Sequence, residues 1–343
     1  MASVIMAIQR ALALLCLLAT AWQQCVAGER REMRLADKLG QYNIYMNRTT
    51  VSGLSAGGFF AVQYHVAFSS QVIGAGIVAG GPYYCAEGIL TSATVNCMKV
   101  PLMINVPWLI ARAKMMSGID NLEHLQRSRV FLYSGSKDTV VNPGVMKKLD
   151  EWYQAFVPAA NIKTEFDIPS EHSWVTMDYG NECSFLGSPY INKCHYALAE
   201  NLYHWIRQDN ATAGVVDQNS VFEFDQSEFT TASESMDSTG YVYVPKACQS
   251  GELKCKFHIS FHGCLQGRET VGQDYVLHAG LAQLAETTAT IVLFPQVKKS
   301  SLLPLNPNGC FDWWGYAGSN YATRNGKQMQ SVYMMARRIA GEI

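Results

Sequence analysis

Short apolar runs alternate along the chain with segments of helical periodicity. A short apolar run bounded by turn-forming residues is typical of a strand that is buried on both faces. Such runs lie near Val51 and at 72–79, 130–133, 164–168, 241–244, 257–261 and 291–294. Helical spacing between the runs predicts helices at 58–68, 143–156, 197–208, 275–287 and 327–339. This alternation predicts an α/β fold with a mostly parallel sheet flanked by helices.

Residues 210–238 break this pattern. The segment is polar and rich in Ser, Thr, Asp and Glu, and we interpret it as an exposed connection, which would also suit a domain boundary. We nevertheless predict one catalytic domain over residues 28–343. The reason, developed below, is that the strands on both sides of this segment are needed in the same sheet.

The N-terminus has the composition of a secretory signal peptide. Arg10 precedes an apolar run over 11–22, and small residues follow at 25–28. This order of charged, apolar and small residues predicts a signal peptide over residues 1–27 that is cleaved after Ala27. The apolar run is too short to span a bilayer, which takes about 20 residues. We therefore expect a secreted, extracellular protein with no membrane segment after cleavage.

The cysteines agree with an oxidising compartment. Eight of the ten follow the predicted signal peptide: Cys85, Cys97, Cys183, Cys194, Cys248, Cys255, Cys264 and Cys310. An even number in a secreted chain suggests disulfides, although the sequence allows roughly a hundred connectivities. Pairing of near neighbours would join Cys85 to Cys97, Cys183 to Cys194 and Cys248 to Cys255, leaving Cys264 for Cys310. A zinc site is the alternative, and the lack of a CxxC pair argues against a metal.

Charge and sequons indicate which partners and modifications to expect. The 27 Lys and Arg residues nearly balance the 28 Asp and Glu residues, and no basic tract stands out. We therefore expect no nucleic-acid partner. Asn47 and Asn210 each begin an Asn-x-Thr sequon and are candidates for glycosylation in a secreted chain.

Gly53-Leu54-Ser55-Ala56-Gly57 matches the G-x-S-x-G pattern of a nucleophilic serine. In that pattern the serine lies on a sharp, strained turn between a strand and a helix, and the flanking glycines let neighbouring backbone approach closely. A β-branched segment precedes the motif and an amphipathic helix pattern follows it. Ser55 is therefore the candidate nucleophile.

A nucleophilic serine needs a base, and the base needs a carboxylate that orients it. Asp138 lies a few residues after the run at 130–133, and His172 lies a few residues after the run at 164–168. Sites in open α/β sheets form where strands end, and the order acid then histidine is that of α/β-hydrolases. Two alternatives stay open: Asp138 could cap the helix that begins near Pro143, and His172 could be an exposed loop residue.

Two backbone N–H groups are needed to stabilise the oxyanion of an ester intermediate. Ala56 follows the nucleophile and supplies one, while the other normally comes from a His-Gly loop after an earlier strand. No such loop precedes Ser55, but His262-Gly263-Cys264 follows the run at 257–261. This order suggests a circular permutation in which the C-terminal helix replaces the helix that leads into the nucleophile strand. Under this hypothesis the Cys264 N–H is the second donor.

The motifs taken together resemble those of the single-domain, circularly permuted poly(3-hydroxybutyrate) depolymerases and their esterase relatives. The matching segments span most of the chain in the family's order: 53–58, 79–83, 135–138, His172, 262–264 and 310–316. The resemblance implies a triad of Ser55, Asp138 and His172, with oxyanion donors at Ala56 and Cys264. It also implies that a tryptophan of the pair Trp313 and Trp314 lies in the substrate crevice, whereas the alternative is that both pack in the core.

The predicted function is a secreted serine esterase that hydrolyses polyhydroxyalkanoate-type esters through an acyl-enzyme. The mechanism requires neither a metal nor an organic cofactor. A carboxylesterase for small acyl, feruloyl or acetyl esters would use the same residues and is the first alternative. The second alternative is a non-catalytic binding protein on a hydrolase scaffold.

Overall fold

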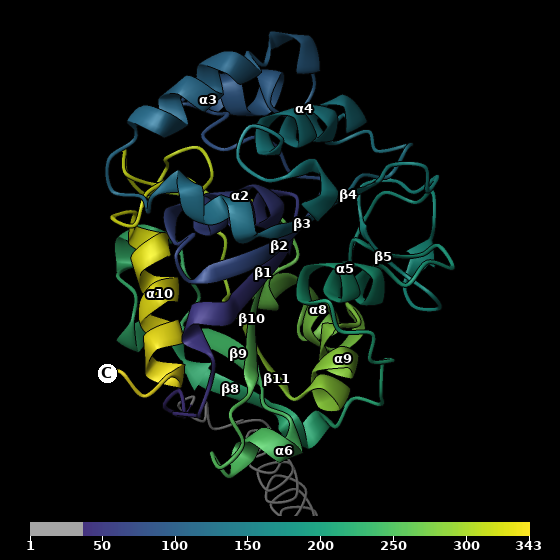
Figure 1. Cartoon of the computed structure of the whole chain (residues 1–343), viewed down its shortest axis with the longest axis vertical. Helices are drawn as coiled ribbons and strands as arrows, with labels where there is room; N and C mark the ends of the chain where they lie inside the picture. Colours follow the sequence, from purple (N-terminus) through teal and green to yellow (C-terminus); the bar gives the residue numbers. More distant parts are fainter. Residues whose placement is uncertain (1–36) are drawn as a thin grey trace, which may run out of the picture. The chain divides into compact units, whose positions relative to one another are not determined.

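The computed structural model describes residues 37–343, which form one compact unit. The predicted signal peptide over residues 1–27, and the first residues of the predicted domain, lie outside the described residues. An eight-stranded sheet runs between two layers of helices (Figure 1). Its strands, in spatial order, are β4 (Ile162–Glu165), β3 (Arg129–Tyr133), β2 (Val72–Val78), β1 (Thr49–Leu54), β10 (Lys256–Phe261), β11 (Thr290–Phe294), β9 (Thr239–Tyr243) and β8 (Val221–Asp225).

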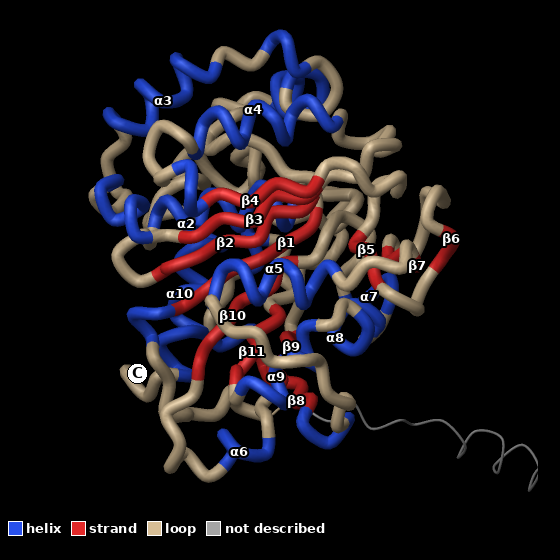
Figure 2. The backbone as a smooth tube through the Cα atoms, turned by 45° about the vertical axis from the view of Figure 1, so that its right-hand side comes forward, coloured by secondary structure: helices blue, strands red, loops and turns tan. Residues whose placement is uncertain are grey.

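The sheet is parallel from β4 to β11, and only β9 and β8 join it antiparallel. Every residue of β1 is buried, because helices cover both faces of the central strands. One layer contains α2 (Ala56–Ala67), α4 (Pro143–Tyr153) and α10 (Lys327–Ile339), and the other contains α5 (Leu198–Arg207), α8 (Asp274–His278) and α9 (Leu281–Thr288) (Figures 1 and 2). These elements confirm the predicted α/β class.

A glycine on β2 sets the distance between the sheet and α5. A Cβ atom on Gly76 would lie 2.3 Å from the side chain of Leu202. Because real Cβ atoms do not approach this closely, only glycine lets α5 pack directly on β2.

The remaining elements are short or peripheral. The helices are α3 (Val106–Met115), α6 (Lys246–Gln249) and α7 (Arg268–Val271), and a second sheet has the order β5 (Trp174–Thr176), β7 (Ile191–Lys193) and β6 (Asn181–Glu182). Short segments of 3₁₀ or π helix lie at Met46–Arg48, Ser92–Asn96, Pro101–Met103, Leu122–Arg127, Ala159–Asn161, Gln218–Ser220, Gln226–Glu228 and Ala232–Glu234. None of the helices within residues 37–343 is long and apolar enough to cross a membrane.

The strand order agrees with the predicted circular permutation. Although β10 is about 200 residues later in the chain, it pairs directly with β1, with Gly53 opposite Phe261. The end of α10 contacts the segment that leads into β1, since the Tyr42 N–H donates to the Ile339 carbonyl at 2.7 Å. The C-terminal helix therefore occupies the position predicted for it beside the nucleophile strand.

Three predicted elements differ from the structure. The strand predicted at 164–168 is β4, which begins two residues earlier and ends at Glu165. The predicted helix at 275–287 is two helices, because Gly280 has φ +84° and ends the first before the second begins. The predicted exposed connection at 210–238 contains β8, an edge strand that pairs with β9 and forms a single bridge to Asp37 through Phe224. An edge strand exposes polar residues on one side, and this is why its composition resembled a loop.

All eight described cysteines form disulfides, and they pair as the near-neighbour scheme predicted. The pairs are Cys85–Cys97, Cys183–Cys194, Cys248–Cys255 and Cys264–Cys310. The last one joins the loop after β10 to the segment that contains the tryptophan pair, 46 residues further along the chain.

Candidate active site

Ser55 lies between the last residue of β1 and the first residue of α2. Its φ of +58° and ψ of −123° are strained for a residue with a side chain, and strain of this kind clusters at functional sites. A Cβ atom on Gly53 would lie 2.2 Å from the Gly57 carbonyl oxygen, and one on Gly57 would lie 2.2 Å from that of Phe261. The glycines of the motif are therefore required by the tight turn and by the contact with β10.

Asp138 and His172 form a buried pair. The His172 Nδ1 lies 2.7 Å from the Asp138 Oδ2, and His172 is 5% exposed and Asp138 6%. Asp138 Oδ1 accepts the N–H groups of Val140 and Val141, both at 2.8 Å, which fixes the carboxylate plane. Because a carboxylate only accepts, Nδ1 carries the proton and Nε2 of the neutral ring has a free lone pair. This is the tautomer that a general base needs.

Both alternatives for this pair are wrong. The N-cap of α4 is Asn142, whose side chain accepts the Gly144 N–H at 2.8 Å, so Asp138 does not cap the helix. His172 is buried rather than exposed on a loop. The two residues were correctly predicted to meet, since they follow neighbouring parallel strands.

Backbone and side-chain hydrogen bonds tie the loop of Asp138 to the loop of His172. The Ser136 N–H donates to the Ile168 carbonyl at 2.8 Å, and the hydroxyls of Tyr133 and Ser170 lie 2.8 Å apart. A Cβ atom on Gly135 would lie 2.2 Å from the Ser170 carbonyl oxygen, so glycine is required where the loops cross. The acid and the base are thus held by one rigid assembly.

Ser55 is 8% exposed, and its hydroxyl makes no hydrogen bond to another described residue. Ser55 follows β1 and His172 follows β4, and both strands end at the same edge of the sheet. The contact between the Ser55 hydroxyl and the imidazole therefore stays a prediction.

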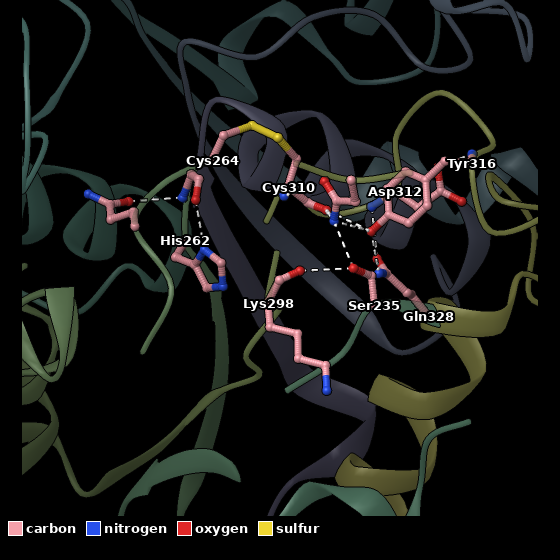
Figure 3. The surroundings of a disulfide bond; sticks show 11 residues. Ser235, His262, Cys264, Lys298, Cys310, Asp312, Tyr316 and Gln328 are labelled. Carbon is pink, nitrogen blue, oxygen red and sulfur yellow. Dashed lines mark hydrogen bonds between the residues drawn. A yellow bond between two sulfur atoms is a disulfide. The ribbon is translucent and has the colours of Figure 1, made fainter. Parts of the chain in front are cut away.

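The loop after β10 contains the predicted second oxyanion donor. The His262 Nδ1–H donates to the Gly263 carbonyl at 2.7 Å, and its Nε2 accepts the Val297 N–H at 3.0 Å. Burial lowers the pKa of His262 to about 4, so the ring is neutral at physiological pH. The Gly263 carbonyl and the Cys264 N–H belong to one planar trans peptide, in which they point in opposite directions. His262 therefore fixes the direction of the Cys264 N–H beneath the disulfide to Cys310 (Figure 3).

An apolar cavity of about 290 Å³ lies beside this loop. Its walls include Cys264, Trp313 and Trp314, together with Leu90 and Leu305. One tryptophan of the pair was predicted to lie in the substrate crevice, with packing of both in the core as the alternative. Trp313 is 5% exposed and stacks on Phe59, at 4.0 Å between ring centroids, whereas Trp314 is half-buried. One ring is thus largely core, yet both face the cavity.

Comparison with known proteins extends these observations. No protein-family model matches the chain. The chain is 35% identical over 320 residues to a polyhydroxybutyrate depolymerase of Talaromyces funiculosus, covering 89% of this chain and 93% of that protein. The chain belongs to the polyhydroxybutyrate depolymerase family. This confirms the resemblance drawn from the motifs.

Other family members give the same result. Identity to a poly(3-hydroxybutyrate) depolymerase of Delftia acidovorans is 43% over 315 residues, and the chain spans 62% of that relative's length. A crystal structure of PHB depolymerase from Penicillium funiculosum matches with a TM-score of 0.81 and 31% identity, covering 89% of this chain and 99% of that one. A PHB depolymerase complexed with an R3HB trimer matches with a TM-score of 0.82 and the same identity.

Glu171 borders the candidate triad, and the sequence did not reveal it. Its carboxylate accepts the N–H of His172 at 2.6 Å and the N–H of Thr139 at 3.1 Å, and it also bonds the Thr139 hydroxyl. Burial raises the pKa of Glu171, but these hydrogen bonds outweigh it and the net pKa is lowered. The ionised group links the residue after Asp138 to the histidine. The only sequence signal was an acidic residue next to His172.

Asp312 holds the loop that contains the tryptophan pair. Its carboxylate accepts the N–H groups of Gly315 at 2.6 Å, Tyr316 at 3.0 Å and Ala317 at 3.0 Å. Burial raises the pKa of Asp312 to about 6, although the hydrogen bonds from the loop lower it. The side chain folds the loop around itself and thereby sets where Trp314 lies.

His65, on α2, has structural partners. The two ring nitrogens of His65 contact the Tyr153 hydroxyl at 3.0 Å and the Ser128 hydroxyl at 2.9 Å. Burial lowers the pKa of His65 to about 3, which keeps the ring neutral. These contacts make His65 a packed core residue.

Proposed function

We propose that the chain is an extracellular serine esterase that hydrolyses poly(3-hydroxybutyrate)-type polyesters. One observation carries the proposal. In a chain of the depolymerase family, a serine on a strained strand–helix turn shares a sheet edge with a buried Asp138–His172 pair, whose hydrogen bond places the proton of the neutral imidazole on Nδ1. Membership of the family adds the substrate class, because its crystallised member binds an R3HB trimer.

The first half-reaction forms an acyl-enzyme. His172 Nε2 takes the proton of the Ser55 hydroxyl while the serine oxygen attacks the ester carbonyl carbon, which gives a tetrahedral oxyanion. The N–H groups of Ala56 and Cys264 stabilise that negative charge. The ester C–O bond then breaks, and the imidazolium donates its proton to the leaving alkoxide, so that an alcohol departs.

The second half-reaction releases the acid. Water enters in place of the alcohol, His172 takes one of its protons, and the hydroxide oxygen attacks the acyl carbon. Collapse of the second oxyanion breaks the bond to Ser55 and returns the proton to the serine. Asp138 stays ionised throughout, holds the Nδ1–H tautomer and stabilises the imidazolium.

The surroundings of the cavity support a polymer over a small soluble ester. Leu90 and Leu305, which line the cavity, are 53% and 58% exposed, and Leu303 on the same loop as Leu305 is 92% exposed. Exposed apolar side chains around a site are typical of surfaces that bind other apolar material. A polyester chain continues with apolar material on both sides of the ester bond that is cut, whereas a small acyl ester does not.

Two further features belong to the proposal. A single catalytic domain over residues 28–343 is supported by the one sheet that joins both halves of the chain. Secretion is supported by four disulfides, which persist in oxidising compartments, together with the signal-like N-terminus. Asn47 and Asn210 are both exposed, as glycan acceptors must be.

A substrate panel tests the proposal. Purified wild type and Ser55→Ala are compared on poly(3-hydroxybutyrate) film, on soluble 3-hydroxybutyrate oligomers, and on small acyl, feruloyl and acetyl esters. The proposal predicts Ser55-dependent release of hydroxybutyrate from both film and oligomers. Turnover of small esters with no release from oligomers would instead identify a carboxylesterase. Absence of Ser55-dependent turnover on every substrate would favour a binding protein.

A further inference from the structure

Gln266 is a buried amide for which the reaction steps above have no use. It is 1% exposed and lies two residues after Cys264, before the short helix α7. Leu265 between them has φ +57°, and this sharp turn brings the Gln266 side chain back toward the start of the loop. Its Oε1 accepts the Gly263 N–H at 2.9 Å.

The other end of the amide reaches the segment behind the histidine. Gln266 Nε2 donates to the Pro189 carbonyl at 3.0 Å and to the Tyr190 carbonyl at 3.2 Å. The Tyr190 carbonyl also accepts the Trp174 N–H at 2.9 Å, and Trp174 begins β5, two residues after His172. A single side chain thus bridges the loop of the oxyanion donor and the strand that follows the base.

The partners of Gln266 fix which way the amide faces. Its nitrogen lies near two carbonyl oxygens and its oxygen near an N–H, so the reverse orientation would lose all three hydrogen bonds. Both ends of the amide are therefore paired: the oxygen accepts one N–H, and the nitrogen donates to two carbonyls. A buried amide with all its partners in place is rigid and costly to disturb.

Gln266 completes a clamp on one residue, Gly263. It holds the Gly263 N–H on one side, while His262 holds the Gly263 carbonyl on the other. With both ends of that residue fixed, the plane of the next peptide is fixed too, and with it the direction of the Cys264 N–H. Among the described residues the Cys264 N–H donates no hydrogen bond, so it is free for an oxyanion.

We infer that Gln266 is a positioning residue of the oxyanion hole, which sets the Cys264 N–H relative to the strand that follows His172. The inference rests on the proposed function, because it assigns the Cys264 N–H to the oxyanion. Its consequence is specific: a displaced donor stabilises the tetrahedral intermediate less but leaves substrate binding unchanged.

The test replaces Gln266 by Met, which keeps the length of the side chain, and by Ala, which removes any steric burden. Gln226 supplies a matched control. It is also buried, accepts the Gln296 N–H at 2.9 Å, and donates to the carbonyls of Asp237 and Gln296 at 2.7 Å. Replacing Gln226 by Met or Ala therefore removes the same number and kind of hydrogen bonds, but none of them involves residue 263 or residue 264.

Three quantities are measured on a soluble 3-hydroxybutyrate oligomer: kcat, KM, and the Ki of a trifluoromethyl ketone whose adduct with Ser55 carries an oxyanion. Loss of a whole oxyanion donor costs about 10²–10³ in kcat. For a displaced donor we expect a loss of about tenfold to a hundredfold, an unchanged KM, and a Ki that rises by the same factor. The Gln226 variants should lose comparable thermal stability but keep kcat within about threefold.

Each other outcome overturns the inference. Folded Gln266 variants with nearly full kcat would show that the donor needs no such support, and equal losses in the Gln226 variants would point to general loosening of the fold. If neither Gln266 variant folds while both Gln226 variants do, Gln266 serves folding rather than positioning. Failure of the proposed function is distinguishable, because wild type would then show no turnover that Ser55→Ala abolishes.

Discussion

Replacing Asp312 by Asn should change how stability depends on pH. Burial raises the pKa of Asp312 from 3.8 to about 6, although three N–H groups of the tryptophan loop favour its ionised form. At about 1.4 kcal/mol per pH unit, this rise corresponds to on the order of 3 kcal/mol of folding free energy. The side chain is only 2% exposed, so solvent screening reduces this value little.

The sign follows from proton linkage. Between pH 4 and pH 6 the folded state binds the Asp312 proton while the unfolded state has released it, so rising pH favours unfolding. The contribution of Asp312 is thus fully present below about pH 4 and is lost as pH rises through about 6. Asn does not titrate, so the variant lacks this dependence whatever its absolute stability.

Urea unfolding of wild type and Asp312→Asn at half-unit steps from pH 4 to pH 7.5 measures the effect. The free energy of unfolding of wild type, minus that of the variant, should fall by on the order of 3 kcal/mol across this range and level off above about pH 7. A difference that stays flat, or that rises with pH, would refute the reasoning. It would mean that the hydrogen bonds from Gly315, Tyr316 and Ala317 outweigh the cost of burial.

Four further predictions concern the site and its support. Asp138→Asn should lower kcat on a soluble ester by about 10⁴ with little loss of folding, because the amide favours the wrong imidazole tautomer; a loss under about tenfold would contradict this role. Trp313→Ala should cost about 3–5 kcal/mol in urea unfolding, since its ring stacks on buried core. Trp314→Ala should spare stability but slow film hydrolysis more than oligomer hydrolysis, and equal losses on both substrates would assign it to folding. Replacing both Cys264 and Cys310 by Ser removes the disulfide that closes a 46-residue loop. The free energy of urea unfolding should fall by about 4 kcal/mol, because the unfolded chain gains conformational entropy, and an unchanged value would contradict this.

The sequence predicted the parts of the site that depend on local geometry. The turn at Ser55 was predicted because a strained strand–helix turn requires glycines at fixed offsets, and the meeting of Asp138 and His172 was predicted because parallel strands end at one edge of the sheet. Residues whose role depends on distant backbone were not found. Glu171 contacts Thr139, 32 residues earlier, and Gln266 contacts carbonyls about 75 residues away, so the spacing of nearby residues did not reveal either contact.

The fold was predicted to a similar extent. The buried central strands are continuous apolar runs, and their positions in the structure agree with the predicted ones. The edge strand β8 was missed because one of its sides pairs with no other strand, so it needs no continuous apolar run. The break at Gly280 was missed because a glycine within a helical pattern is often tolerated, and only its φ of +84° shows that the helix ends there.

The central claim is that Ser55 is a nucleophile activated by His172, and covalent labelling tests it most directly. Wild type and His172→Ala are treated with a fluorophosphonate, and the adduct is located by peptide mass spectrometry. The account predicts one adduct per molecule, on Ser55, in wild type, and a reaction slower by at least about a thousandfold in His172→Ala. Folded wild type that gains no adduct, or gains it on another residue, would contradict the account.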